Sequence, residues 1–193
     1  MSRCQTTQKM LTASKPYGHS HINLCLSIST AEIFDIPIFL TTQNKDRLGD
    51  TVPDLGLHDA HASRVKASIN KSKFSMVVPE LLTTLESISQ PTKPACIIVG
   101  IESHICVTQT ALDLLERGYP VYILADGVSS CNREEVPIAL RRLASAGATV
   151  TSSESILYEI CGDAGRSEFK ALGKLVRESK DKTTDVLNTL CKI

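Results

Sequence analysis

The stretch ACIIVGIESHICVTQTALDLLERGYPVYILAD, residues 95–126, decides the fold class of this chain. Residues 95–99 and 121–125 are short, continuous apolar runs, which are typical of strands buried on both faces of a parallel sheet. Residues 105–117 between them have helical periodicity, and Gly118 follows at the position that commonly ends a helix. A strand, a helix and a strand at this spacing predict one β-α-β crossover.

The same pattern continues on both sides of this stretch. Residues 36–41 and 148–151 predict two further strands, and the predicted helices cover residues 79–88, 134–146, 152–161 and 167–179. Pro79 suits the first turn of a helix, and Gly147 suits the end of one. The alternation of strands and helices therefore predicts an α/β fold with a doubly wound parallel sheet.

The length of 193 residues suits one domain, and we expect that domain to cover residues 1–178, with a C-terminal tail over residues 179–193. The tail reads either as a short amphipathic segment that packs on a partner subunit or as a frayed end. Residues 43–75 are expected to form a long polar connection, and connections of that length are usually functional or mobile.

Composition excludes several classes of function. Lys+Arg and Asp+Glu both number 21, so a strongly basic nucleic-acid binder is unlikely, although a local basic patch stays open. No apolar run is long enough to span a membrane. The seven cysteines form no C-x-x-C pair, and no secretory signal opens the chain, so we expect an intracellular, reducing compartment without disulfides or structural zinc. The first 31 residues lack Asp and Glu, which leaves cytoplasm and mitochondrion both open.

The best candidate for chemistry is Cys106. The preceding strand ends at Val99, Ser103 is a plausible N-cap, and Cys106 falls in the first turn of the next helix, where unpaired N–H groups favour a thiolate. The functional interpretation is a cysteine nucleophile, and the alternative is a buried core cysteine. Lys71 or Lys73 could reach the same edge of the sheet and stabilise the thiolate by its charge.

Other polar residues give weaker signals. His58, Asp59 and His61 have metal-ligand chemistry at close spacing, but their flanking residues match no metal motif, so we expect neither metal nor cofactor. His104 could line the mouth of a pocket. The remaining candidates are expected to be solvated: they are His19 and His21, and the basic stretch of Arg64, Lys66, Lys71 and Lys73, for which a phosphate or RNA contact is the alternative.

Several motifs together resemble a known family. Residues 99–130, VGIESHICVTQTALDLLERGYPVYILADGVSS, resemble the nucleophile segment of the isochorismatase-like cysteine hydrolases. KFSM (73–76), TTQNKDRLGDTVPDLG (41–56) and GDAGRSEFKALGKLV (162–176) resemble the branch of isochorismatase domain-containing proteins. The chain also resembles the trypanosomatid members of that branch that carry the name mitochondrion-associated ribonuclease. The resemblance runs from about residue 4 to about residue 178 and is most specific in its central third.

The resemblance implies a fold and a catalytic set. The family fold is a three-layer α/β/α structure with a six-stranded parallel sheet, and its catalytic residues are an Asp, a Lys and a Cys. The Cys corresponds to Cys106 and the Lys to Lys71, with Phe74 and His104 expected at the pocket. A non-proline cis peptide bond is expected at Ile101–Glu102, where the backbone N–H groups of Glu102 and Cys106 would form an oxyanion hole.

The family Asp has no counterpart here. It lies in a segment similar to C-D-M-Q-E-K-F, which aligns with CQTTQKM, residues 4–10, so that Gln5 stands at its position. A neutral Gln cannot act as a general base at pH 7.

Three hypotheses follow from this departure. The first is a cysteine hydrolase that acts, weakly, on a small amide, imide or ester. The second is a catalytically retired member that serves as a binding or assembly module. The third is a ribonuclease or RNA-associated protein. We expect a small-molecule substrate and a homo-oligomer, a dimer or larger, with no membrane partner, and nucleic acid as an unlikely partner.

Overall fold

The strands of this protein form two parallel sheets. The computed structural model describes residues 20–57, 59–88 and 92–190. β1 (Ile38–Gln43) pairs with β2 (Val65–Lys71), while β3 (Cys96–Ile101), β4 (Val121–Ser129) and β5 (Thr149–Thr151) pair in that order. The predicted α/β fold with parallel strands is therefore confirmed. The predicted six-stranded sheet is not seen in the described ranges, which show sheets of two and three strands.

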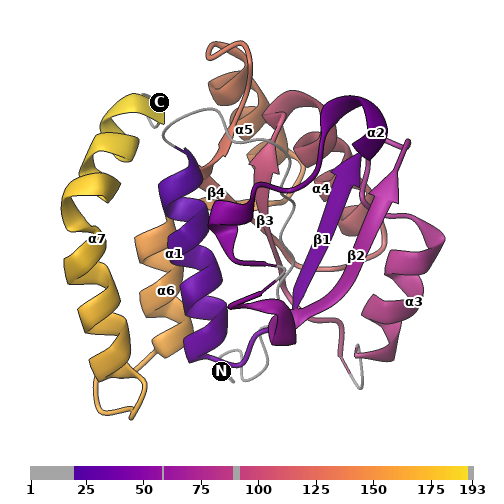
Figure 1. Ribbon diagram of the computed structural model, residues 1–193. Helices are drawn as coiled ribbons and strands as arrows, with labels where there is room; N and C mark the ends of the chain where they lie inside the picture. The colour runs from indigo at the N-terminus through magenta and orange to yellow at the C-terminus, as the bar shows by residue number, and fades with distance from the viewer. Residues whose placement is uncertain (1–19, 58, 89–91, 191–193) are drawn as a thin grey trace.

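Helices cover both sides of the strands. Figure 1 shows α1, α6 and α7 on one side, and α3, α4 and α5 on the other. The helices are α1 (Ser20–Ile33), α2 (Lys45–Leu48), α3 (Pro79–Ser87), α4 (Thr108–Glu116), α5 (Glu135–Ser145), α6 (Ser153–Cys161) and α7 (Phe169–Leu190). Shorter turns are η1 (Pro53–Leu55), η2 (Ala62–Arg64) and the π-helical η3 (Ser103–Val107). Among the helices of the described residues, none is both long and apolar enough to cross a membrane.

Strand β3 shows why both sides of the sheet need helices. Ile98 packs with Leu81 and Leu114 of α3 and α4, whereas its neighbour Ile97 packs with Ile28 of α1 and Ile156 of α6. Successive side chains of a strand point to opposite faces, so a strand that is apolar throughout buries both faces.

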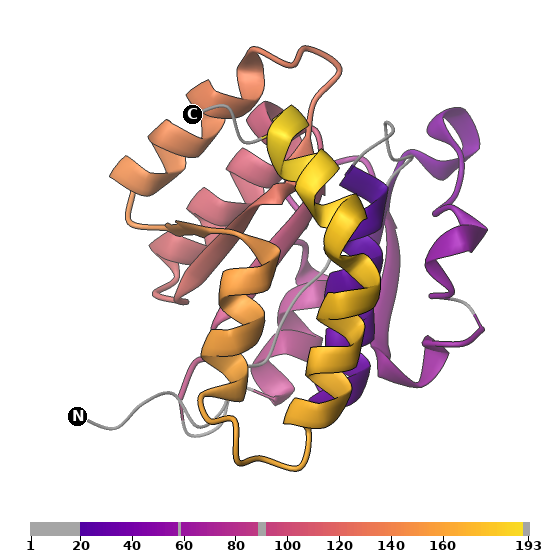
Figure 2. The same cartoon turned by 90° about the vertical axis from the view of Figure 1, so that its left-hand side faces the viewer.

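Helix α7 is longer than the sequence pattern predicts. It continues from the expected helix over residues 167–179 into the segment expected as a tail, as far as Leu190. Thr183 and Val186 are buried, and α7 lies along α1 (Figure 2). The burial of these two side chains explains why the helix does not end near residue 179.

The prediction of a long polar connection over residues 43–75 is wrong in its second half, because residues 65–71 form β2. The side chains of Val65, Ala67 and Ile69 are half-buried, and those between them are exposed. This alternation is that of a strand with one face toward the core and one toward solvent.

Two glycines permit the close approach of β3 and β4 near their carboxyl ends. The pairing register shifts between Ile98 and Gly100, and Gly100 has a φ of 139°, which side chains rarely adopt. A Cβ atom on Gly127 would lie 2.8 Å from Cγ1 of Val99. Beyond the shift, Ile101 pairs with Ser129, so the segment after β3 lies beside the turn after β4.

Candidate active site

The carboxyl ends of β1, β2 and β3 bring together the groups of the candidate site. Gln43 and Lys71 are the last residues of β1 and β2 and are paired neighbours in the sheet. Glu102 directly follows β3 and begins the turn that carries Cys106. Ligands of open α/β sheets bind beyond the carboxyl ends of the strands.

Cys106 lies in the π-helical turn η3 rather than in the first turn of an α-helix. The N–H of Val107 donates to the carbonyl oxygen of Glu102 at 3.2 Å, five residues back, and α4 begins only at Thr108. The predicted N-cap role of Ser103 is wrong, because its hydroxyl is buried and has no hydrogen-bond partner among the described residues. Single π-helical turns occur frequently at functional sites.

Four influences act on the half-buried thiol of Cys106. Burial is the largest and raises the pKa of the thiol; the charge of Lys71 and a hydrogen bond from the backbone of Glu102 lower that pKa, and the Glu102 carboxylate raises it again. The net direction is upward, so the expectation of a depressed pKa is not met in this structure. The reason is physical: the loss of solvation outweighs the nearby positive charge.

Lys71 is buried and fully engaged. Its Nζ donates hydrogen bonds to Oε1 of Gln43 at 2.7 Å and to the carbonyl oxygens of Lys73 and Phe74, each at 2.9 Å. Burial lowers the pKa of Lys71, and the neighbouring Cys106 raises it. The charge of Lys71 in turn lowers the pKa of the Cys106 thiol, so each of the two groups favours the charged form of the other.

The structure distinguishes between the two lysines that sequence reasoning left open. Nζ of Lys73 lies 3.1 Å from Oδ2 of Asp113 on α4 and donates to the carbonyl oxygen of Val77. Lys71, and not Lys73, is therefore the lysine whose charge acts on the pKa of the Cys106 thiol.

Glu102 contributes both its backbone and its side chain to the site. The peptide bond between Ile101 and Glu102 is cis. The carboxylate accepts hydrogen bonds from the turn after β4, from the hydroxyl of Ser130 and from the N–H of Cys131. His104 is half-buried, with Nδ1 at 3.2 Å from Oγ of Ser130. The side chain of Phe74 is 51% exposed, next to the carbonyl group that binds Lys71.

The other candidate residues either lie elsewhere in the described part of the chain or fall outside it. Within the described part of the chain, no group of three or more His, Cys, Asp or Glu could hold a metal ion. His58 lies outside the described residues, and Nδ1 of His61 lies 3.4 Å from Oε2 of Glu32. Gln5 and His19 also lie outside them. His21 is a residue of α1.

The basic stretch is divided in space. Arg64 pairs with Asp35, Lys66 donates to the carbonyl oxygen of Ser63, and Lys71 is buried. The stretch thus does not form a patch of free positive charge.

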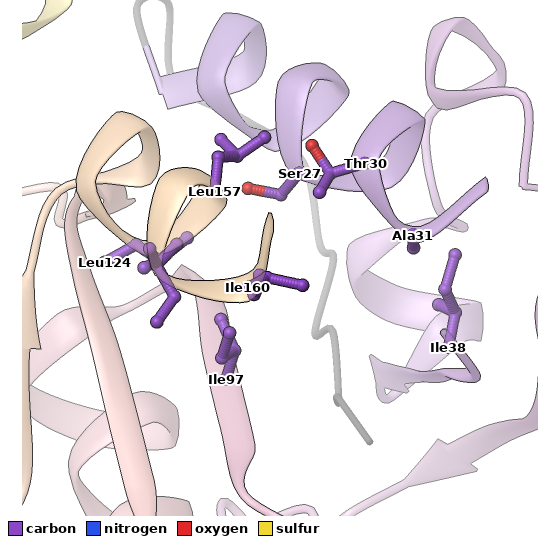
Figure 3. Close-up of a pocket in the computed structure, with 9 residues that line it drawn as sticks. Ser27, Thr30, Ala31, Ile38, Ile97, Leu124, Leu157 and Ile160 are labelled. Atoms are coloured by element: carbon purple, nitrogen blue, oxygen red, sulfur yellow. The ribbon is translucent and has the colours of Figure 1, made fainter. Parts of the chain in front are cut away.

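A separate small apolar pocket lies between α1, α6 and the strands. Figure 3 shows Ile97 and Ile38 from two strands facing Leu157 and Ile160 of α6. The described residues that line this pocket do not include Cys106 or Lys71.

Sequence reasoning missed Gln43 and Ser130. Gln43 ends a buried strand in TTQ, and Ser130 follows another in GVSS. Their position after a strand was the available signal, because polar residues there meet at the ligand-binding edge of a parallel sheet.

Parallel sheets with helices on both sides, and polar groups gathered at the carboxyl ends of the strands, define an α/β protein of the kind that binds small molecules at that edge. The chain belongs to the isochorismatase family, since the Isochorismatase domain matches residues 12–155.

Two curated relatives and one solved structure illustrate this membership. The secreted isochorismatase effector Isc1 of Phytophthora sojae is 40% identical over 151 residues, which are 78% of this chain and 71% of that protein. Isochorismatase domain-containing protein 2 of Xenopus laevis is 36% identical over 78% of this chain and 70% of its own length. The structure of MAR1 ribonuclease from Caenorhabditis elegans has a TM-score of 0.79 at 32% identity and covers 91% of this chain and 93% of that one.

Proposed function

We propose that this protein is an isochorismatase-like hydrolase that cleaves a small amide, imide or ester through Cys106. The observation that carries the proposal is the placement of three groups at the carboxyl ends of neighbouring strands: the thiol of Cys106, and the buried ammonium of Lys71 and the backbone of Glu102, which both lower the pKa of that thiol. A nucleophile, a fixed positive charge and a backbone donor are what acyl transfer through a cysteine requires.

The proposed reaction has two stages. The Cys106 thiolate attacks the substrate carbonyl carbon, and the backbone N–H groups of Glu102 and Cys106 stabilise the developing oxyanion. The C–N or C–O bond then breaks, the leaving group takes a proton, and an acyl-thioester remains. Water hydrolyses this thioester and restores the thiol. Lys71 stabilises the thiolate by its charge throughout.

We further propose that the two sheets belong to one six-stranded sheet within a domain over residues 1–178, with Gln5 beside Cys106. In the family an Asp at this position takes the thiol proton and returns it to the leaving group. Gln5 cannot do so, and general acid–base catalysis contributes typically about 10²–10⁴ in rate. The proposed activity is therefore weak. No metal or cofactor enters the proposal, and Phe74 and His104 are proposed to line the substrate pocket.

The test is a panel of small amides, imides and esters, measured with the wild type and with Cys106→Ser. Cys131→Ser is the matched control, because Cys131 is an exposed cysteine in the neighbouring turn. We expect hydrolysis that Cys106→Ser abolishes and Cys131→Ser retains. Equal residual activity in both variants would refute Cys106 as the nucleophile.

A second candidate is a retired enzyme that acts as a binding or assembly module. The raised pKa of the Cys106 thiol favours it, since less thiolate is present at neutral pH. Alkylation by iodoacetamide distinguishes the hydrolase from the retired enzyme. In a hydrolase, Cys106 is alkylated near pH 7 faster than the exposed Cys131, and in a retired enzyme it is alkylated more slowly.

Ribonuclease activity is a third candidate, motivated by the name of the Caenorhabditis elegans protein. Phosphate contacts predict that RNA affinity falls steeply with salt. The pairing of Arg64 and Lys73 with acidic residues argues against such contacts in this stretch.

We also propose that the protein forms a homo-oligomer, which light scattering can test. We propose a reducing compartment as its location, either cytoplasm or mitochondrion. All five cysteines of the described residues are free thiols, which supports a reducing compartment.

A further inference from the structure

The carboxylate of Glu102 is anchored to the turn that follows β4. Its Oε2 accepts from Oγ of Ser130 at 2.8 Å and from the N–H of Cys131 at 2.9 Å, while Oε1 lies 3.2 Å from that same N–H. Hydrogen bonds to an ionised acceptor are stronger than those between neutral groups.

The backbone of the same residue is directed at the catalytic turn. The carbonyl oxygen of Glu102 accepts from the N–H groups of Ile105 and Val107, which flank Cys106, and the Glu102 backbone lowers the pKa of the Cys106 thiol. Glu102 thus connects two segments: the Ser130–Cys131 turn through its side chain, and the Cys106 turn through its main chain.

Ser130 extends the connection to His104. The Ser130 hydroxyl has one proton, which it donates to Glu102, so it accepts from the N–H of Asn132 at 3.2 Å. Nδ1 of His104 lies 3.2 Å from Oγ of Ser130 and 3.7 Å from Oε2 of Glu102, and both neighbours are acceptors. Nδ1 of His104 therefore carries a proton, and His104 adds a further donor to this cluster.

We propose that Glu102 is a positioning residue, whose carboxylate, held by Ser130 and Cys131, keeps its own backbone and the Cys106 turn bonded to it in a fixed position beside the thiol. The inference rests on the proposed function of Cys106 as a nucleophile. It assigns to the side chain of Glu102 a role apart from its charge, which by itself opposes formation of the thiolate.

Charge and anchoring can be separated by two variants. Glu102→Gln and Glu102→Ala both remove the negative charge, but only Gln retains a side-chain oxygen that can accept from Cys131. The measured quantity is the thiol pKa of Cys106, from the pH dependence of its alkylation by iodoacetamide, with the modified peptide quantified by mass spectrometry.

Loss of the charge alone lowers the thiol pKa, so the thiol pKa of Cys106 in Glu102→Gln should be lower than in the wild type. Loss of the anchor lets the Glu102 backbone, which lowers the pKa of the thiol, move relative to Cys106. The thiol pKa of Glu102→Ala should therefore be about one unit above that of Glu102→Gln, a tenfold change in the thiolate equilibrium. Glu116→Gln, which removes an exposed carboxylate at the end of α4, should leave the pKa unchanged. Equal values for Glu102→Gln and Glu102→Ala would overturn the proposal.

A second pair keeps the test decisive if Glu102→Ala does not fold. Ser130→Ala should raise the thiol pKa, and Ser130→Thr, which retains the hydroxyl, should restore it; an unchanged value in Ser130→Ala would count against the proposal. Alkylation needs no substrate, so a wild type without hydrolytic activity would refute the proposed function and leave this comparison valid.

Discussion

Gln43 accepts a hydrogen bond from the Lys71 ammonium, and its replacement gives the sharpest prediction for the site. Gln43 supplies one of the three acceptors of the Lys71 ammonium, at 2.7 Å, and its own Nε2 donates to the carbonyl oxygen of Ser72 at 2.6 Å, which fixes the orientation of the amide. Gln43→Met keeps the length of the side chain and removes the acceptor. A hydrogen bond to a charged group is worth about 1.5–3 kcal/mol, which corresponds to about 1–2 pKa units.

Gln43 stabilises the charged ammonium form of Lys71, so removing its acceptor lowers the pKa of Lys71. Because Gln43 is half-buried and water partly replaces it, we expect the pKa of Lys71, already lowered by burial, to fall by about one further unit in Gln43→Met. Gln43→Glu, which places a carboxylate at the same position, should raise it. The pKa is read from the ¹³Cε chemical shift of Lys71 against pH, assigned with Lys71→Arg. An unchanged titration in Gln43→Met would refute the reasoning.

Three further predictions concern stability and rate. Gly127→Ala should destabilise the protein by about 1–3 kcal/mol, because its Cβ would lie 2.8 Å from a buried valine, whereas Gly173→Ala, in open space within α7, should stabilise it by up to about 1 kcal/mol; thermal unfolding of both variants checks the opposite signs. Burial raises the pKa of Asp126 above that of the unfolded chain, so its contribution to stability is greatest below about pH 4 and declines as pH rises through the folded pKa. Urea unfolding against pH should show a smaller decline for Asp126→Asn than for the wild type. Gln5→Asp should raise hydrolysis by about 10²-fold if proton transfer limits the rate, and no gain across the substrate panel would favour the retired-enzyme hypothesis.

The helices and buried strands could be predicted from sequence because their signals are local. The runs at residues 95–99 and 121–125 are continuous and apolar, and β3 and β4 formed there, each extending further toward the site. β2 was missed because its inward residues, Val65, Ala67 and Ile69, alternate with polar ones in a stretch that reads as polar overall. Period-2 alternation was present, but a one-sided strand gives a weaker signal than a fully buried one.

The site was predictable only in part. Position after a strand singled out Cys106, whereas position alone left Lys71 and Lys73 both open, and only the family resemblance favoured Lys71. The upward direction of the pKa of Cys106 depends on how deeply the thiol is buried, and no local pattern encodes that depth. The contacts of Glu102 with Ser130 join residues 28 positions apart, which spacing alone does not reveal.

The three hydrogen bonds of the Lys71 ammonium have a consequence for substrate choice. An ammonium group has three N–H bonds, and here all three point at neutral oxygens of the protein itself. Lys71 therefore acts on a substrate through its electric field and has no N–H group left to donate to it. An anionic group of a substrate could contact Nζ only by displacing Gln43 or a main-chain carbonyl. Discrimination between substrates of equal charge must then come from the shape and polarity of the residues that line the substrate pocket. Substitutions of those residues should alter KM and leave the electric field of Lys71 at the Cys106 sulfur unchanged.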